Sequence, residues 1–134
     1  MADILEHLVN PVGLLKELRN SLDVNGYVII FIPNIAYYIL RLMLLRGIFK
    51  YQDHGILDKT HLRFYTFYTA REMVRSAGYK IDMCEGYGFG FPFGRLSKIP
   101  VINILYNLIT KSLLKYPNIF ASHTLIKASL EFHK

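Results

Sequence analysis

The chain has 134 residues, of which 52% are hydrophobic and 19% charged, and its formal net charge is +6. This composition excludes a disordered, collagen-like or low-complexity chain, and the length predicts a single domain over residues 1–134. The only cysteine, Cys84, excludes a disulfide framework and a cysteine zinc cluster, so we expect a reducing, cytoplasmic location. We expect Cys84 itself to be buried and unreactive, because it has no basic neighbour in the sequence.

The positive charge is uneven along the chain. Residues 1–34 sum to −2, residues 35–80 to +5 and residues 81–134 to +3. A basic surface of this kind suits nucleic acid, anionic lipid or a phosphorylated substrate, although ordinary solvated surface has the same composition. Acidic residues stand at the N-terminus, where a secretory signal peptide would have basic ones.

The first third of the chain predicts a helix, a strand and a second helix. Residues 11–22 have apolar residues on one helical face, with Asn10 as N-cap and Pro11 at the first position. Residues 27–32 are β-branched or aromatic, which predicts a buried strand that Pro33 ends. An apolar helix is expected over 35–46. Residues 27–45 approach the length of a membrane span, but Pro33 and Arg41 interrupt them, so we predict the separate strand and helix instead.

The middle of the chain predicts a polar loop, then a helix and a strand. Helical periodicity is lost over 47–65, where acidic, basic and histidine residues are concentrated. Thr69 and Glu72 have the spacing of a capping box, and a helix with Ala70, Met73, Val74 and Ala77 on one face would follow and stop at Gly78. A short strand is expected over 79–85.

The last third predicts a glycine-rich loop, a helix and a strand. The run Gly86, Gly88, Gly90 has Phe91 where a dinucleotide-binding fingerprint requires glycine, so we interpret 86–98 as an aromatic loop. Residues 99–115 are amphipathic with helical spacing, and residues 122–132 alternate between apolar and polar as a strand does. The order of these elements predicts an α/β layered sheet.

Asp3, Glu6 and His7 lie within five residues, and His61 belongs to a polar cluster that could fold against them. Carboxylates with imidazoles bind divalent metals or serve as general acids and bases, and they also occur as hydrogen-bonded structural groups. All three interpretations stay open at this point.

Three segments carry a family resemblance. They are Asp3-Ile4-Leu5-Glu6-His7-Leu8, Gly26-Tyr27-Val28-Ile29-Ile30 ending in Pro33-Asn34, and Gly55-Ile56-Leu57-Asp58-Lys59-Thr60-His61-Leu62-Arg63-Phe64-Tyr65-Thr66. The first two resemble the second half of class I S-adenosylmethionine-dependent methyltransferases, and the third is similar to their bacterial subgroup of type 11 or type 12. The resemblance is specific over residues 3–80 and one of pattern only over 81–134. It covers the second half of the methyltransferase domain, because nothing here resembles the first strand and its glycine-rich cofactor loop.

The resemblance implies a partial Rossmann-like sheet made of strands five to seven with flanking helices, the last strand being antiparallel. Regions 35–66 and 86–118 would be insertions on the substrate side that serve as lids. It implies His7 and His61 as catalytic residues, Asp3 and Leu5 as cofactor contacts, and Pro33, Asn34, His61 and Arg63 as substrate contacts. S-adenosylmethionine is the implied cofactor, although most of its binding elements are missing.

Other implications concern metals and partners. The small-RNA 2′-O-methyltransferases hold a metal with a Glu-x-x-Glu-His set and a distant His, to which Asp3, Glu6, His7 and His61 are similar, but Asp3 replaces the first Glu and we assign no metal. We expect a small-molecule or lipid-linked acceptor, with a homo-oligomer and peripheral membrane contact as further expectations, and we do not expect nucleic acid. The alternative is a non-catalytic interaction or membrane-surface module.

Overall fold

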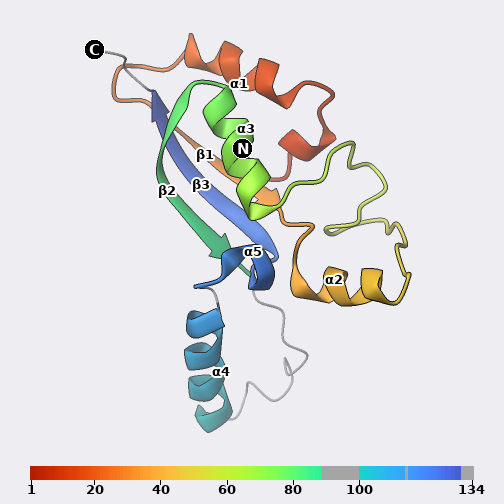
Figure 1. Cartoon of the computed structure of the whole chain (residues 1–134). Coiled ribbons are helices and arrows are strands. Elements are labelled where there is room, and N and C mark those ends of the chain that lie inside the picture. The colour runs from red at the N-terminus through yellow and green to blue at the C-terminus, as the bar shows by residue number, and fades with distance from the viewer. Residues whose placement is uncertain (89–99, 114, 131–134) are drawn as a thin grey trace.

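The computed structural model describes residues 1–88, 100–113 and 115–130, and the structural statements below concern these residues. Helices and strands alternate along them, in agreement with the predicted α/β class (Figure 1). The strands are β1 (Tyr27–Pro33), β2 (Tyr79–Tyr87) and β3 (His123–Leu130); the helices are the 3-10 turn η1 (Leu5–His7), α1 (Pro11–Arg19), α2 (Tyr38–Leu45), α3 (Phe67–Ser76), α4 (Pro100–Leu113) and α5 (Pro117–Phe120).

The strands form one sheet in the order β1-β3-β2, and β3 is antiparallel to both of its neighbours. The prediction of an antiparallel last strand is therefore confirmed. Ile30 of β1 pairs with Ile126 of β3, and both side chains are fully buried. On the outer edge of β1, Ala2 makes a parallel bridge with Phe31, so the N-terminal residues run alongside this strand.

Helix α3 covers one face of the sheet (Figure 1). Its residues Ala70, Met73 and Val74 are buried, as the helical spacing predicted, because they pack on the inward side chains of the strands. Helix α1 packs against α3, and the Tyr79 hydroxyl donates a buried hydrogen bond of 2.9 Å to the Leu15 carbonyl oxygen.

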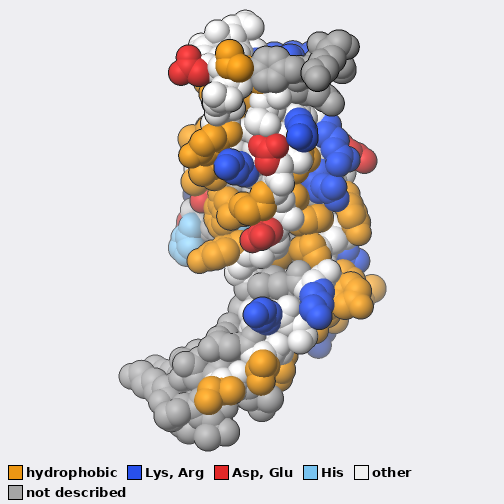
Figure 2. All heavy atoms as spheres, turned by 90° about the vertical axis from the view of Figure 1, so that its left-hand side faces the viewer, with side chains coloured by type: hydrophobic (Ala, Val, Ile, Leu, Met, Phe, Trp, Pro, Cys, Tyr) orange, Lys and Arg blue, Asp and Glu red, His pale blue; other side chains and the backbone are white. Residues whose placement is uncertain are grey.

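The opposite face of the sheet is largely exposed. Tyr27 and Ile29 of β1, and Met83 and Tyr87 of β2, present apolar side chains to the surface. The prediction of a fully buried strand over 27–32 is wrong, because the described helices that cover the sheet pack on one side and every second residue faces away from them. Figure 2 shows hydrophobic side chains gathered between charged ones on the side of the molecule that it displays.

Three helix boundaries differ from the prediction, and one of them is the start of the helix expected over 35–46, which begins at Tyr38 as α2. Asn10 caps α1 as predicted, since its side-chain oxygen accepts a 2.9 Å hydrogen bond from the Gly13 N–H, but the helix ends at Arg19 and continues as turns to residue 22. Helix α3 begins with Thr66 as N-cap, three residues before the predicted Thr69. Gly78, with φ of +82°, follows this helix as predicted.

The glycine-rich region begins later than predicted. Strand β2 continues through Tyr87, and a Cβ atom at Gly86 would lie 2.6 Å from Pro117 and Ala121, so glycine permits the close approach of α5. The predicted helix over 99–115 is present as α4, and the short α5 follows it. Gly90, Phe89, Phe91, Phe93 and Phe132 lie outside the described residues.

The apolar stretch 27–45 is divided between β1 and α2, as predicted. Within the described part of the chain, every helix is too short or too polar to cross a membrane. Helix α2 and the loop after it form a second apolar cluster, in which Tyr37, Leu40 and Leu57 are buried, apart from the core under the sheet.

Candidate functional site

A cavity of about 200 Å³ lies at the carboxyl end of β1. It is lined by Asp3, His7, Pro33, Gly55, Asp58, His61 and His123. These residues come from the N-terminal segment, the end of β1, the polar loop after α2 and the start of β3, so the fold brings together four parts of the chain that are distant in sequence.

Main-chain pairing with β1 places the N-terminal residues at the cavity. The Asp3 N–H donates to the Phe31 carbonyl oxygen at 3.1 Å, and the Phe31 N–H donates to the Met1 carbonyl oxygen at 2.9 Å. Asp3 has φ of +48°, in the left-handed region, and η1 begins two residues later. The turn directs the chain across the end of the sheet, where Glu6 and His7 follow.

The polar loop is attached to η1 by its main chain. The Leu62 and Arg63 N–H groups both donate to the Glu6 carbonyl oxygen, at 2.9 and 3.1 Å. The Arg63 guanidinium also donates to the Val9 carbonyl oxygen at 2.6 Å. These three bonds hold His61 against the segment that carries His7.

The two imidazoles lie against each other with their ring centroids 4.7 Å apart. His7 Nδ1 is 3.2 Å from the Thr60 carbonyl oxygen, and His61 Nδ1 is 3.1 Å from the Ile56 carbonyl oxygen. A carbonyl oxygen only accepts, and the Thr60 hydroxyl, which is also 3.2 Å from His7 Nδ1, donates to Asp58, so Nδ1 is the donor of each ring in these contacts. The Nε2 lone pair of each ring is therefore available to accept a proton or to bind a cation.

Glu6 lies beneath the imidazoles and is almost fully buried. Its Oε1 is 3.9 Å from His61 Nε2, and neither carboxylate oxygen has a hydrogen-bond partner among the described residues. Burial raises the pKa of the Glu6 carboxyl, and the charge of Asp3 raises it further, while the two histidines act in the opposite direction. A buried carboxylate of this kind favours a positive charge close to it.

Glu6, His7 and His61 are also the described residues that could hold a metal ion. Each offers one ligand atom, and these atoms lie within 4.8 Å of one another. The unsatisfied Glu6 oxygens, together with imidazoles whose Nδ1 groups face main-chain carbonyl oxygens, fit the surroundings of a divalent transition-metal ion. The same groups fit a proton shared between the imidazoles and the carboxylate.

Sequence reasoning did not single out Asp58 or His123 as site residues. The Asp58 carboxylate accepts hydrogen bonds from the Thr60 hydroxyl at 2.6 Å and the Thr60 N–H at 2.8 Å, which lower the pKa of Asp58. His123 stacks on Phe31 with a centroid distance of 4.7 Å. Its place opposite Pro33 follows from the strand register, which the sequence pattern of one strand does not contain. For Asp58 the sequence did offer a signal, because this residue belongs to the cluster of polar residues over 53–63.

The structure places the predicted site residues in two groups. Asp3, His7, Pro33 and His61 line the cavity, whereas Leu5, Asn34 and Arg63 do not. The Leu5 side chain is in the core, and the buried Asn34 amide donates to the Ala121 carbonyl oxygen at 2.8 Å. Cys84 is half-buried rather than fully buried, and burial raises the pKa of its thiol.

No protein-family model matches the sequence, and no curated protein matches it. Function is therefore inferred from the chemistry of the cavity and from the sequence motifs around it.

Proposed function

We propose that this chain forms the substrate side of a class I S-adenosylmethionine-dependent methyltransferase. The observation that carries the proposal is the convergence of Asp3, His7, Pro33 and His61 on one cavity at the carboxyl end of β1. Ligands of open α/β sheets bind at the carboxyl ends of strands, and the family resemblance implies that the methyl acceptor binds at this place. The antiparallel β3 and the parallel bridge between Ala2 and Phe31 support a partial Rossmann-like sheet of strands five to seven.

The imidazoles would take the proton that an acceptor hydroxyl or amine loses. His61 Nε2 lies 3.9 Å from Glu6 Oε1, so the carboxylate would stabilise the imidazolium that forms when Nε2 takes the proton. His7 lies against the same ring and is the second candidate base. Pro33 and Asp3 would shape the wall against which the acceptor is oriented.

The described residues do not fit a complete cofactor site. S-adenosylmethionine, when bound, supplies an electrophilic methyl group, but a cavity of about 200 Å³ is below the usual range of about 300–1,000 Å³ for pockets that enclose a drug-sized ligand. Leu5, one of the two implied cofactor contacts, has its side chain in the core. We therefore assign only the acceptor side to these residues.

Calorimetric titration with S-adenosylhomocysteine tests this assignment. We expect little or no heat of binding to the 134-residue chain, and tight binding would show that the cofactor side has been assigned to the wrong part of the domain. The cofactor side would be supplied by a segment that has a glycine-rich loop after a strand, as the resemblance implies. In a protein that contains both this chain and the cofactor segment, His61→Gln should lower the rate of methyl transfer about 100-fold or more, while the affinity for S-adenosylmethionine is retained. Unchanged transfer would contradict a role for His61 as base.

A non-catalytic interaction module is the second candidate. The exposed apolar face of the sheet, with Tyr27, Ile29 and Tyr87, is the observation that favours it. A protein that contains this chain together with a glycine-rich cofactor segment, and that still binds no S-adenosylhomocysteine, would favour this candidate over the methyltransferase.

A further inference from the structure

The outward side of α2 and of the segment after it is apolar. Leu42 is 53% exposed and Leu45 is 83% exposed, and Leu44, Ile48 and Phe49 are exposed as well. The inward side of this helix is apolar too, since Leu40 is buried against Leu57 in the second cluster. A helix that faces water normally has a polar outer side, so an apolar outer side indicates a surface that another apolar phase covers.

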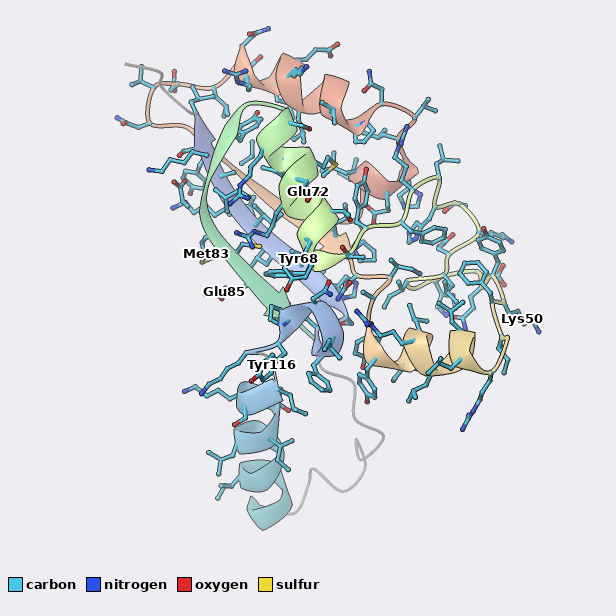
Figure 3. The ribbon with its side chains drawn as sticks, viewed as in Figure 1. Lys50, Tyr68, Glu72, Met83, Glu85 and Tyr116 are labelled. Carbon is cyan, nitrogen blue, oxygen red and sulfur yellow. The ribbon has the colours of Figure 1, made fainter. Side chains whose placement is uncertain are left out.

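The charged residues of segment 35–52 are all positive. Residues 35–52 contain Arg41, Arg46 and Lys50, and the first acidic residue after them is Asp53. All three basic side chains are exposed, and Figure 3 shows Lys50 at the outer margin of the molecule, beyond α2. Basic residues beside exposed leucine and phenylalanine complement the headgroups and acyl chains of an anionic lipid surface.

We propose that this surface docks the protein on an anionic membrane. We define the α2 surface as the exposed apolar residues Leu42, Leu45, Ile48 and Phe49 together with the basic residues Arg46 and Lys50. The leucines and Phe49 enter the boundary between headgroups and acyl chains, and the basic residues contact the lipid phosphates. Arg41 has a smaller share, because its Nε donates to the Ala36 carbonyl oxygen at 2.6 Å.

Aromatic rings connect the α2 surface to the cavity. Phe49 lies 6.1 Å from Phe64 between ring centroids, and Phe64 lies 6.2 Å from His61. A lipid held at the α2 surface would therefore lie two ring contacts away from His61, which lines the cavity. If the proposed methyltransferase function holds, on which this step rests, the substrate class is an acceptor carried by a lipid.

Vesicle sedimentation of the full chain tests the docking without any catalytic readout. The probes are vesicles of phosphatidylcholine alone and of phosphatidylcholine with phosphatidylglycerol, each at low and high salt. We expect binding to the anionic vesicles that weakens at high salt, and much weaker binding to the neutral ones. Absence of binding to either vesicle, in a chain with a folded circular dichroism spectrum, overturns the proposal.

Two variants and their controls locate the contact. Arg46→Gln with Lys50→Gln should lower partitioning into anionic vesicles about 30-fold, and Leu42→Gln with Leu45→Gln should lower it at least about tenfold. The matched controls are Lys16→Gln with Lys80→Gln, and Val24→Gln at a position that is 73% exposed in the turn before β1. Equal losses in the controls, or vesicle binding unchanged in the α2 variants, would contradict docking through this surface.

A headgroup-nitroxide lipid gives the orientation. The paramagnetic broadening of the backbone amide NMR signals should be strongest at residues 42–49 and weaker at residues 55–61. It should be absent from α1. Strongest broadening at α1 or β2 would overturn the proposal, as would α2 variants that change the oligomeric state instead of vesicle binding. Because neither measurement involves S-adenosylmethionine, docking and methyl transfer fail or succeed separately.

Discussion

His7 and His61 are oriented by main-chain carbonyl oxygens, whereas the buried Glu6 carboxylate beside them has no hydrogen-bond partner among the described residues. The sequence identified both histidines and the acidic residues near His7, because clustered ionisable residues are visible in a linear chain. It could not predict that Glu6 would be the buried member and Asp3 the exposed one. That difference arises from the turn at Asp3 and from η1, which direct neighbouring side chains to opposite sides.

His123 should make folding stability depend on pH. Burial lowers the pKa of His123 below its ordinary value of 6.5, although Asp3 acts in the opposite direction. The neutral ring is therefore favoured in the folded state, and its stabilising contribution is present above pH 6.5 and is lost as the pH falls through the lowered folded-state pKa. We expect His123→Gln to reduce the loss of unfolding free energy between pH 7.5 and pH 5.5, as measured by urea denaturation.

His54 provides the control for this measurement, since it is an exposed histidine in the polar loop. His54→Gln should leave the difference in unfolding free energy between the two pH values as in the original chain. If His123→Gln and the original chain lose the same unfolding free energy on acidification, the partial burial of His123 does not make stability depend on pH.

At the scale of elements, the start of α3 shows how one residue type can indicate the wrong boundary. The Thr66 hydroxyl accepts a 3.1 Å hydrogen bond from the Thr69 N–H, and the Thr69 hydroxyl accepts a 2.8 Å bond from the Thr66 N–H. Thr69 and Glu72 have the sequence spacing of a capping box, but the actual box uses Thr66 and Thr69. Phe67 is buried and belongs to the first turn, which a helix beginning after Thr69 would have excluded.

Alanine substitutions distinguish the two possible caps. Thr66→Ala should lower the unfolding free energy by about 1 kcal/mol, because it removes the acceptor for a main-chain N–H at the helix start. Thr69→Ala should cost less, since Thr66 would still cap the helix. Urea denaturation of both variants gives the comparison, and a larger loss for Thr69→Ala would mean that the helix begins where the sequence alone placed it.

Periodic segments predicted their elements well, and irregular ones did not. The inward residues of α3 and β3 repeat with a period that the sequence shows directly. The end of β2 and the presence of α5 depend on the contact between Gly86 and Pro117, which are 31 residues apart in the chain. A contact of this kind leaves no local pattern in either segment.

At the scale of the molecule, the cavity could be predicted only in part. The resemblance brought together the segments of Asp3, His7, Pro33 and His61, because it carried a strand arrangement with it. His123 entered the cavity wall through the pairing of Pro33 with His123, which is set when β3 inserts between β1 and β2. Strand order is a property of the whole sheet, so single-strand patterns do not contain it.

The open face of the sheet should cause the chain to self-associate. Tyr27, Ile29 and Tyr87 are each at least 50% exposed, and exposed large apolar side chains on one sheet face are often covered by a partner. We expect sedimentation velocity to show a concentration-dependent dimer or larger species in the absence of lipid.

The double variant Ile29→Thr with Tyr87→Thr tests whether this face mediates the self-association. It keeps residues that favour strands, removes much of the apolar area and should shift the population towards the monomer. The control Val24→Thr, at an exposed apolar residue in a turn, should leave the distribution unchanged. A chain that sediments as a monomer at every concentration would show that the face does not mediate self-association.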